Sequence, residues 1–175
     1  QQGYAHYLPA AMREVHLYGP THPPTWLASL PLDLAFRWHN SLRLFPDDVD
    51  ASPESSPVMV STGGLTLPVR YSSKERAVLE LLDELPERES FQQVDALMEG
   101  LSDLSPRRLQ TLLEACTSVK GKRLFLFFAS RHGHAWLARL DTSRVNLGAG
   151  KRVLVKGGKL DPRYNITVPP EFGAH

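Results

Sequence analysis

The sequence predicts an α+β fold, in which a β-rich first part and a short closing β element flank a helical middle. Three observations support this prediction. Residues 14–71 contain short runs of alternating apolar residues, the apolar period lengthens to three or four residues from Ser72, and glycine-rich turns separate short β-type runs after residue 145. We therefore divide the chain into a β-rich part (1–71), a helical part (72–145) and a C-terminal β element (146–175), and expect them to form one compact domain.

The first seventy residues contain signals for short strands. EVHLY (Glu14–Tyr18) alternates apolar and polar residues and predicts a strand, and Pro24–Ser29 can form a short helix. LAFRWH and SLRLF predict two strands joined near Asn40 and Ser41. Further on, PVMVS and LTLPVRYS flank the turn Ser61–Gly64, which predicts a β-hairpin with Pro68 in an edge strand.

The helical part begins with a capping signal. Ser72 and Glu75 stand at capping-box spacing before an apolar stripe that ends at Pro86, and Ser90 with Gln93 starts a second helix in the same way. A third helix is expected from Ser105, with a proline in its first turn.

A fourth helix is expected over Val119–Arg131, ended by Gly133. Its apolar face would hold Leu124, Phe127 and Phe128. Lys120, Arg123 and Arg131 would point towards solvent. The segment KRLFLFF within it is also compatible with a strand. After this helix, HAWLARL predicts one or two helical turns, and KRVLVKG and YNITVP predict strands around the turn GGKLDP.

Charge is segregated along the chain. The segment from Cys116 to Arg163 contains eleven Lys or Arg and two Asp, a net charge of +9 (11 − 2), whereas residues 1–115 contain nine basic and sixteen acidic side chains. The whole-chain net charge of +1 therefore conceals a basic segment. Such a segment favours a polyanion or an acidic protein surface as its partner.

Composition excludes several classes of protein. No run of about 18 apolar residues is long enough to span a membrane, and the N-terminus lacks the features of a signal peptide, so we expect a cytoplasmic protein. The single cysteine, Cys116, forms no internal disulfide and is expected to be buried. The beginning QQGYAHYLPAAM has no initiator Met, which suggests a piece of a longer chain.

Signals for catalysis or cofactors are weak. GAGKR lacks the spacing, the Ser or Thr and the following helix of a phosphate-binding loop. His132 and His134 have no third ligand at regular spacing, and Asp47, Asp48 and Asp50 lack the glycine and the terminal glutamate of a calcium-binding loop. No nucleophile lies beside a base, so we expect no enzyme, no metal and no cofactor.

Three long segments resemble a known family. SSKERAVLELLDELPE, CTSVKGKRLFLFFA and GKRVLVKGGKLDPRYNITVP are similar to the C-terminal region of AbiEi-family antitoxins of type IV toxin–antitoxin systems, and GYAHYLP and LYGP also fit. The resemblance implies an antitoxin domain that counteracts a nucleotidyltransferase-like toxin, without requiring a stable complex. It also implies that a preceding winged helix-turn-helix, which this sequence lacks, binds the promoter of its own operon and represses it.

The basic segment supplies candidate residues for nucleic-acid contact, because each phosphate that a cation neutralises releases a counterion. We predict a basic surface that contains Lys120, Lys122, Arg123, Lys151, Arg152, Lys156 and Lys159. Its two segments form one patch only if the fourth helix packs beside the Lys151 strand. Two alternatives stay open: a solvated surface without a partner, and a non-enzymatic RNA-binding or protein-interaction module with a basic face.

Overall fold

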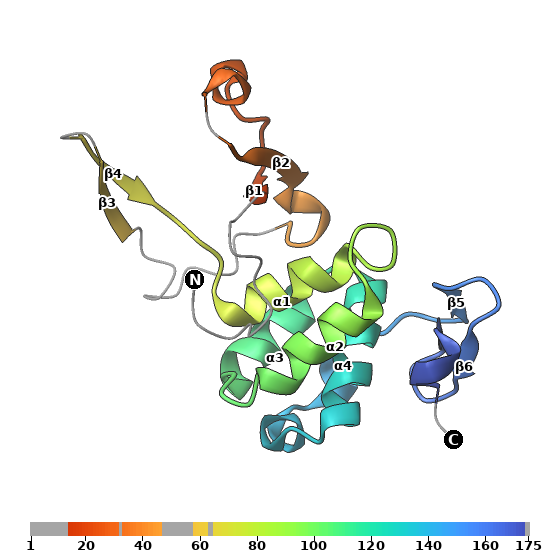
Figure 1. Ribbon diagram of the computed structural model, residues 1–175. Helices are drawn as coiled ribbons and strands as arrows, with labels where there is room; N and C mark the ends of the chain where they lie inside the picture. Colours follow the sequence, from red (N-terminus) through yellow and green to blue (C-terminus); the bar gives the residue numbers. More distant parts are fainter. Residues whose placement is uncertain (1–13, 32, 47–57, 63–64, 174–175) are drawn as a thin grey trace.

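The computed structural model describes residues 14–31, 33–46, 58–62 and 65–173 (Figure 1). Four helices lie at the centre of the molecule, with the N-terminal strands on one side and a small C-terminal sheet on another. The helices are α1 (Lys74–Asp83), α2 (Phe91–Gly100), α3 (Pro106–Ala115) and α4 (Val119–His132). The predicted α+β class is therefore confirmed. Asp47, Asp48 and Asp50, considered above for a cation loop, lie outside the described residues.

The first sheet has two parallel strands. β1 (Glu14–Gly19) pairs with β2 (Ala35–Asn40), and a 3-10 helix over Thr25–Ser29 lies between them in the sequence. The prediction of a further strand over SLRLF is wrong. Ser41–Arg43 forms a 3-10 turn instead, because the Asn40 side chain accepts a hydrogen bond of 3.0 Å from the Leu42 amide and turns the chain.

The second sheet is the predicted hairpin. β3 (Val58–Thr62) pairs antiparallel with β4 (Leu65–Val69), and Thr62 faces Leu65 across the turn. Pro68 therefore lies in an edge strand, as expected for a residue that donates no backbone hydrogen bond.

Serine caps begin all four helices. Ser90, Ser105 and Ser118 each accept a hydrogen bond from the backbone amide three residues later, as Ser/Thr caps commonly do. For α1 the cap is Ser73, whose Oγ accepts from the Arg76 amide, so the predicted cap at Ser72 is wrong by one residue. Ser72 instead donates to the Glu80 carboxylate at 2.8 Å.

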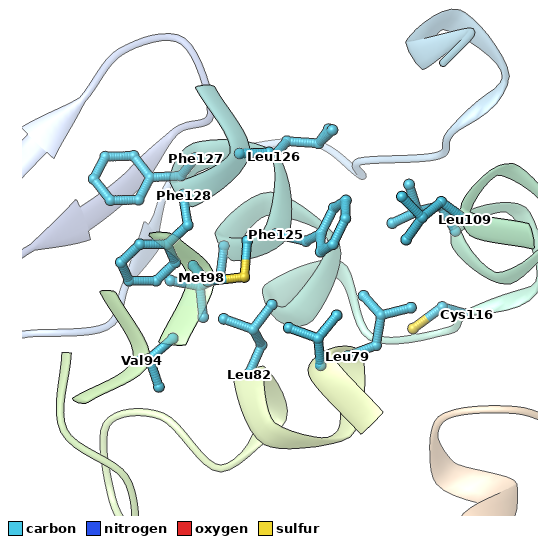
Figure 2. Close-up of a cluster of buried hydrophobic side chains, with 14 of the residues drawn as sticks. Leu79, Leu82, Val94, Met98, Leu109, Cys116, Phe125, Leu126, Phe127 and Phe128 are labelled. Atoms are coloured by element: carbon cyan, nitrogen blue, oxygen red, sulfur yellow. The ribbon is translucent and has the colours of Figure 1, made fainter. Parts of the chain in front are cut away.

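The core lies where α4 packs against α1 and α2 (Figure 2). Leu79 and Leu82 of α1 and Val94 and Met98 of α2 face the phenylalanines of α4. Nine consecutive residues of α4, Gly121–Ala129, are buried. A helix that is covered all round in this way has no solvent face over most of its length. Cys116 is buried, as predicted.

The C-terminal sheet has the order β5-β7-β6, formed by β5 (Arg152–Val153), β6 (Lys159–Asp161) and β7 (Ile166–Val168). β7 is parallel to β5 and antiparallel to β6. The predicted turn GGKLDP thus contains a strand. The chain reverses just before it, at Gly157 with a φ of 75° and at Gly158, where a Cβ would collide with the backbone oxygen of Val168.

A chain of polar contacts joins the first sheet to the helices. His39 Nδ1 lies 3.1 Å from a carboxylate oxygen of Glu84, which follows α1. His39 Nε2 lies 2.9 Å from Nδ1 of His16, and the two rings are stacked. Four residues after β2 in the sequence, the Leu44 carbonyl accepts a hydrogen bond of 2.9 Å from the Thr117 amide.

Candidate nucleic-acid interface

Arg123 is buried rather than exposed to solvent. Its side chain is 2% exposed, so the prediction that it points towards solvent is wrong. The guanidinium donates to four backbone carbonyls, those of Leu147, Gly148, Gly150 and Asn165, at distances from 2.7 to 3.1 Å. Arginine is suited to this role because its five N–H donors have a fixed, forked arrangement.

The GAGKR motif supplies two of the four carbonyls of this clamp, those of Gly148 and Gly150. Gly148 and Gly150 have φ values of 64° and 74°, which L-residues with a side chain adopt at a cost. These two glycines let the loop turn its carbonyl oxygens inward onto one guanidinium. The motif therefore binds a cation of its own chain, whereas a phosphate-binding loop would present amide groups to an anion.

Lys122 is also buried. Its side chain is 4% exposed, and its ammonium makes no hydrogen bond or ion pair with the described residues. Burial lowers the pKa of Lys122, because a charged amine is disfavoured away from water. Its predicted place on a solvent-facing basic surface is wrong, since the position lies on the stretch of α4 that is covered all round.

Lys120 is half-buried and links α4 to the C-terminal end of α1. Its ammonium donates to the carbonyl of Asp83, the last residue of α1, and at 2.8 Å to the carbonyl of Leu85, which follows the helix. It also lies 3.9 Å from the Asp83 carboxylate. Because cations favour the C-terminal end of a helix, these contacts stabilise the junction of α1 and α4.

The C-terminal β element carries its cations on the outside. Lys151, Arg152, Lys156 and Lys159 are all exposed. The side chains of the first three make no ion pair with the described residues. The stem of Lys159 lies over Gly173, where a Cβ would overlap it. Helix α4 does pack beside this element, as the single-patch hypothesis required, but through the buried Arg123 rather than through exposed cations.

Arg163 belongs to the same surface and was missed in the sequence. It is exposed, and its guanidinium lies 5.2 Å from the centre of the Tyr164 ring. Between residues 146 and 173 five cations stand against Asp161 and Glu171, a net charge of +3 (5 − 2). Membership of the net-basic C-terminal segment was the only sequence signal that pointed to Arg163.

The element is fixed to the helices rather than loosely attached. Tyr164 Oη and Ser130 Oγ of α4 form a hydrogen bond of 2.6 Å, and Ile166 and Val168 of β7 are fully buried. By contrast, Val153 of β5 and Leu160 of β6 expose 64% and 41% of their surface. The exposed face of the element thus combines cations with two apolar side chains.

A second group of arginines lies beside α3. Arg107, Arg139 and Arg144 line a hollow of about 480 Å³ beside α3. Arg144 forms a 2.9 Å ion pair with Glu114, which also accepts from Gln110. These arginines come from three separate segments, so spacing in the sequence does not bring them together.

Metal-binding geometry is not found among the described residues, where no group of three or more His, Cys, Asp or Glu side chains converges. His132 Nε2 lies 2.8 Å from the Asp95 carboxylate, and His134 Nε2 lies 2.7 Å from the Met98 carbonyl. Each histidine therefore has its own partner within the chain. No helix in the described part of the chain is long and apolar enough to cross a bilayer.

The fold and this surface define the class first: an α+β protein whose C-terminal β element carries exposed cations. Residues 12–169 match the family model described as "Transcriptional regulator, AbiEi antitoxin, Type IV TA system". The chain belongs to this family of type IV toxin–antitoxin regulators. No curated protein and no solved structure matches the chain.

Proposed function

We propose that this chain is the antitoxin domain of a type IV toxin–antitoxin system, and that it counteracts a nucleotidyltransferase-like toxin. The proposal includes residues 1–71, 72–145 and 146–175 acting as one compact, non-enzymatic and cytoplasmic domain. It is supported by family membership over residues 12–169 and by a core shared among the four helices and the C-terminal sheet.

We further propose that, where a winged helix-turn-helix precedes this domain, the domain supports binding to the operon's own promoter and autorepression. The winged helix would read the sequence, and the C-terminal basic surface would contact the phosphate backbone. We define this surface as Lys151, Arg152, Lys156, Lys159 and Arg163. The observation that carries this step is the exposure of these five cations on one β element that is anchored to α4.

Lys120, Lys122 and Arg123 are left out of the proposed contact surface. Their side chains are half-buried or buried, and those of Lys120 and Arg123 are bound to backbone carbonyls of the protein. Moving either of these two onto a phosphate would leave several carbonyl groups without donors, at a cost of about 1–3 kcal/mol for each group that stays buried.

Co-expression tests the antitoxin activity. We expect this domain alone, produced together with the cognate toxin, to restore growth at least in part. The matched control is the Leu112→Ala variant, which should rescue less because Leu112 is 1% exposed and its truncation costs about 2–5 kcal/mol. Rescue that depends wholly on an added winged helix would contradict the assignment of antitoxicity to this domain.

The exposed Val153 and Leu160 favour a second candidate function, in which the same surface contacts an acidic protein or RNA. Salt dependence alone does not separate these cases, because all are electrostatic. A competition experiment separates them. If promoter duplex and purified toxin bind the same surface, each should displace the other from the full-length regulator. Simultaneous binding would assign the surface to one of them only.

A further inference from the structure

A cleft of about 920 Å³ lies between β1 and α1, away from the basic surface. Every residue from Val15 to Pro20 lines it, whereas no residue of β2 does. The opposite wall comes from α1 and includes Ala77 and Leu81, and the buried Phe45 also contributes to the lining. This volume is at the upper end of the range for ligand pockets, about 300–1,000 Å³.

The lining shows which part of β1 faces the cleft. Successive side chains of a strand point to opposite faces of its sheet, so one face of β1 would present only alternate residues. Contact with each of Val15, His16, Leu17 and Tyr18 therefore means that the cleft adjoins the edge of the strand. Because β2 occupies the other edge, the cleft adjoins the free one.

Along this second edge, β1 has backbone hydrogen-bonding groups that no described residue uses. β1 pairs only with β2 among the described residues, and its outward amides and carbonyls make no hydrogen bond there. Exposed edges are usually protected by proline, lysine or a bulge, and EVHLYG contains none of these. A sheet of two strands is also marginal by itself and gains stability from a third.

We infer that the β1 edge is a docking site for an extended segment of a partner protein, which adds to the sheet as a third strand inside the cleft. Backbone hydrogen bonds to β1 supply the affinity in this mode of recognition, and alternate side chains of the segment supply the specificity. On the α1 side, Ala77 and Leu81 offer an apolar surface to every second side chain.

The charge at one end of the cleft favours a segment with a basic residue. Glu80, Glu84 and Glu89 all line the cleft; Arg76 is bound to Glu80 at 2.9 Å and Arg88 to Glu84 at 3.0 Å. Glu89 is half-buried and makes no ion pair with the described residues. Burial and the neighbouring Glu84 raise the pKa of Glu89, which a cation placed beside it would reverse.

The same charges disfavour a nucleic acid in this cleft. Phosphates would meet the Glu89 carboxylate and the ion-paired carboxylates of Glu80 and Glu84, against the exposed guanidinium of Arg70 and the paired one of Arg76. The inference thus concerns a second surface, with the opposite charge preference from the basic surface, and it does not depend on DNA binding by the latter.

Peptide selection on the purified chain provides the test. Randomised ten-residue peptides are selected for binding, and each is then measured against two pairs of variants. Ala77→Phe fills the cleft, and its control Ala96→Phe places the same ring on the exposed surface of α2. Glu89→Gln removes the unpaired carboxylate, and its control Glu87→Gln removes an exposed one outside the cleft.

We expect peptides with alternating apolar residues and at least one Lys or Arg. Their affinity should fall at least about tenfold for Ala77→Phe and about threefold to tenfold for Glu89→Gln, and stay unchanged for both controls. Hydrogen exchange of the parent protein gives an independent measurement, in which bound peptide should slow the outward amides of Glu14–Gly19. Peptides that bind Ala77→Phe and Ala96→Phe equally well, or leave the β1 amides unprotected, would overturn the inference.

Discussion

Helix α4 and the C-terminal β element both carry closely spaced cations, yet they use them in opposite ways. Lys122 and Arg123 of α4 are 4% and 2% exposed, whereas Lys151, Arg152 and Lys156 are exposed to solvent. The difference follows from packing. α4 is covered by α1, α2 and the loop at Gly148–Gly150, and the short strands β5 and β6 each keep one open edge. Charge density along a sequence therefore does not by itself locate a binding surface.

Among the substitutions that compare α4 with the β element, Arg123→Met should have the largest effect on stability. It removes the donors of four backbone carbonyls, so we expect the free energy of unfolding to fall by about 2–4 kcal/mol in urea titrations. Arg123→Lys should recover only part of this loss, because one ammonium cannot reproduce the forked geometry. A fully stable Arg123→Met variant would mean that the clamp does not hold the β element on α4.

Gly148→Ala tests the loop that surrounds Arg123. The residue has a φ of 64°, and a Cβ would lie 3.1 Å from a methyl group of Val119. We expect a loss of about 1–2 kcal/mol, measured as above. Gly150→Ala is the matched control, since it shares a positive φ but has no atom within 4 Å, and it should lose less. Equal losses would show that the contact with Val119 is unimportant.

Lys122→Met should leave stability unchanged or raise it by up to about 1–2 kcal/mol, because it removes a buried amine that lacks a partner among the described residues. The pKa of Lys122 is lowered by burial, so the unfolded chain binds the proton more tightly. The parent should therefore gain stability as pH rises through the window between the lowered pKa of Lys122 in the folded protein and the ordinary lysine pKa of about 10.4 in the unfolded chain. The Met variant should lack this gain when unfolding is measured across a pH series that ends at about 10.4.

Arg152→Ala and Lys156→Ala should have the smallest effect on stability. Neither side chain has an ion pair with the described residues, so we expect changes below about 0.5 kcal/mol. A larger loss for either variant would show that the residue stabilises the fold, as Arg123 does, and would argue against its place on the binding surface. Thermal melts of the two single variants beside Arg123→Met make this comparison directly.

Much of the fold was predictable because its signals are local. The serine caps at Ser90 and Ser105, the apolar stripes and the hairpin turn each depend on residues close in sequence, and each is found in the structure. The parallel pairing of β1 with β2 and of β5 with β7 was not predicted. Parallel partners are joined by long connections, and pattern within a strand does not reveal them.

The candidate site was predictable only in its C-terminal half. A short strand with glycine turns on both sides leaves its cations exposed, so Lys151 and Arg152 were placed correctly on the surface. For α4 the sequence shows two cations beside apolar residues, a pattern that ordinarily marks a solvent-facing edge. Only the three-dimensional loop around Arg123 reveals that its charge is bound to carbonyls from residues 24 to 42 positions away.

The affinity of the full-length regulator for its promoter duplex, measured across a salt series, tests most directly whether the exposed cations contact DNA. We expect Lys151→Ala combined with Arg152→Ala to weaken binding and to lower the slope of log affinity against log salt by roughly two units. Arg107→Ala combined with Arg139→Ala removes the same charge from the hollow beside α3 and should leave both quantities unchanged. Equal effects of the two double variants, or no effect of the first in a folded protein, would contradict the assignment of phosphate contact to the C-terminal basic surface.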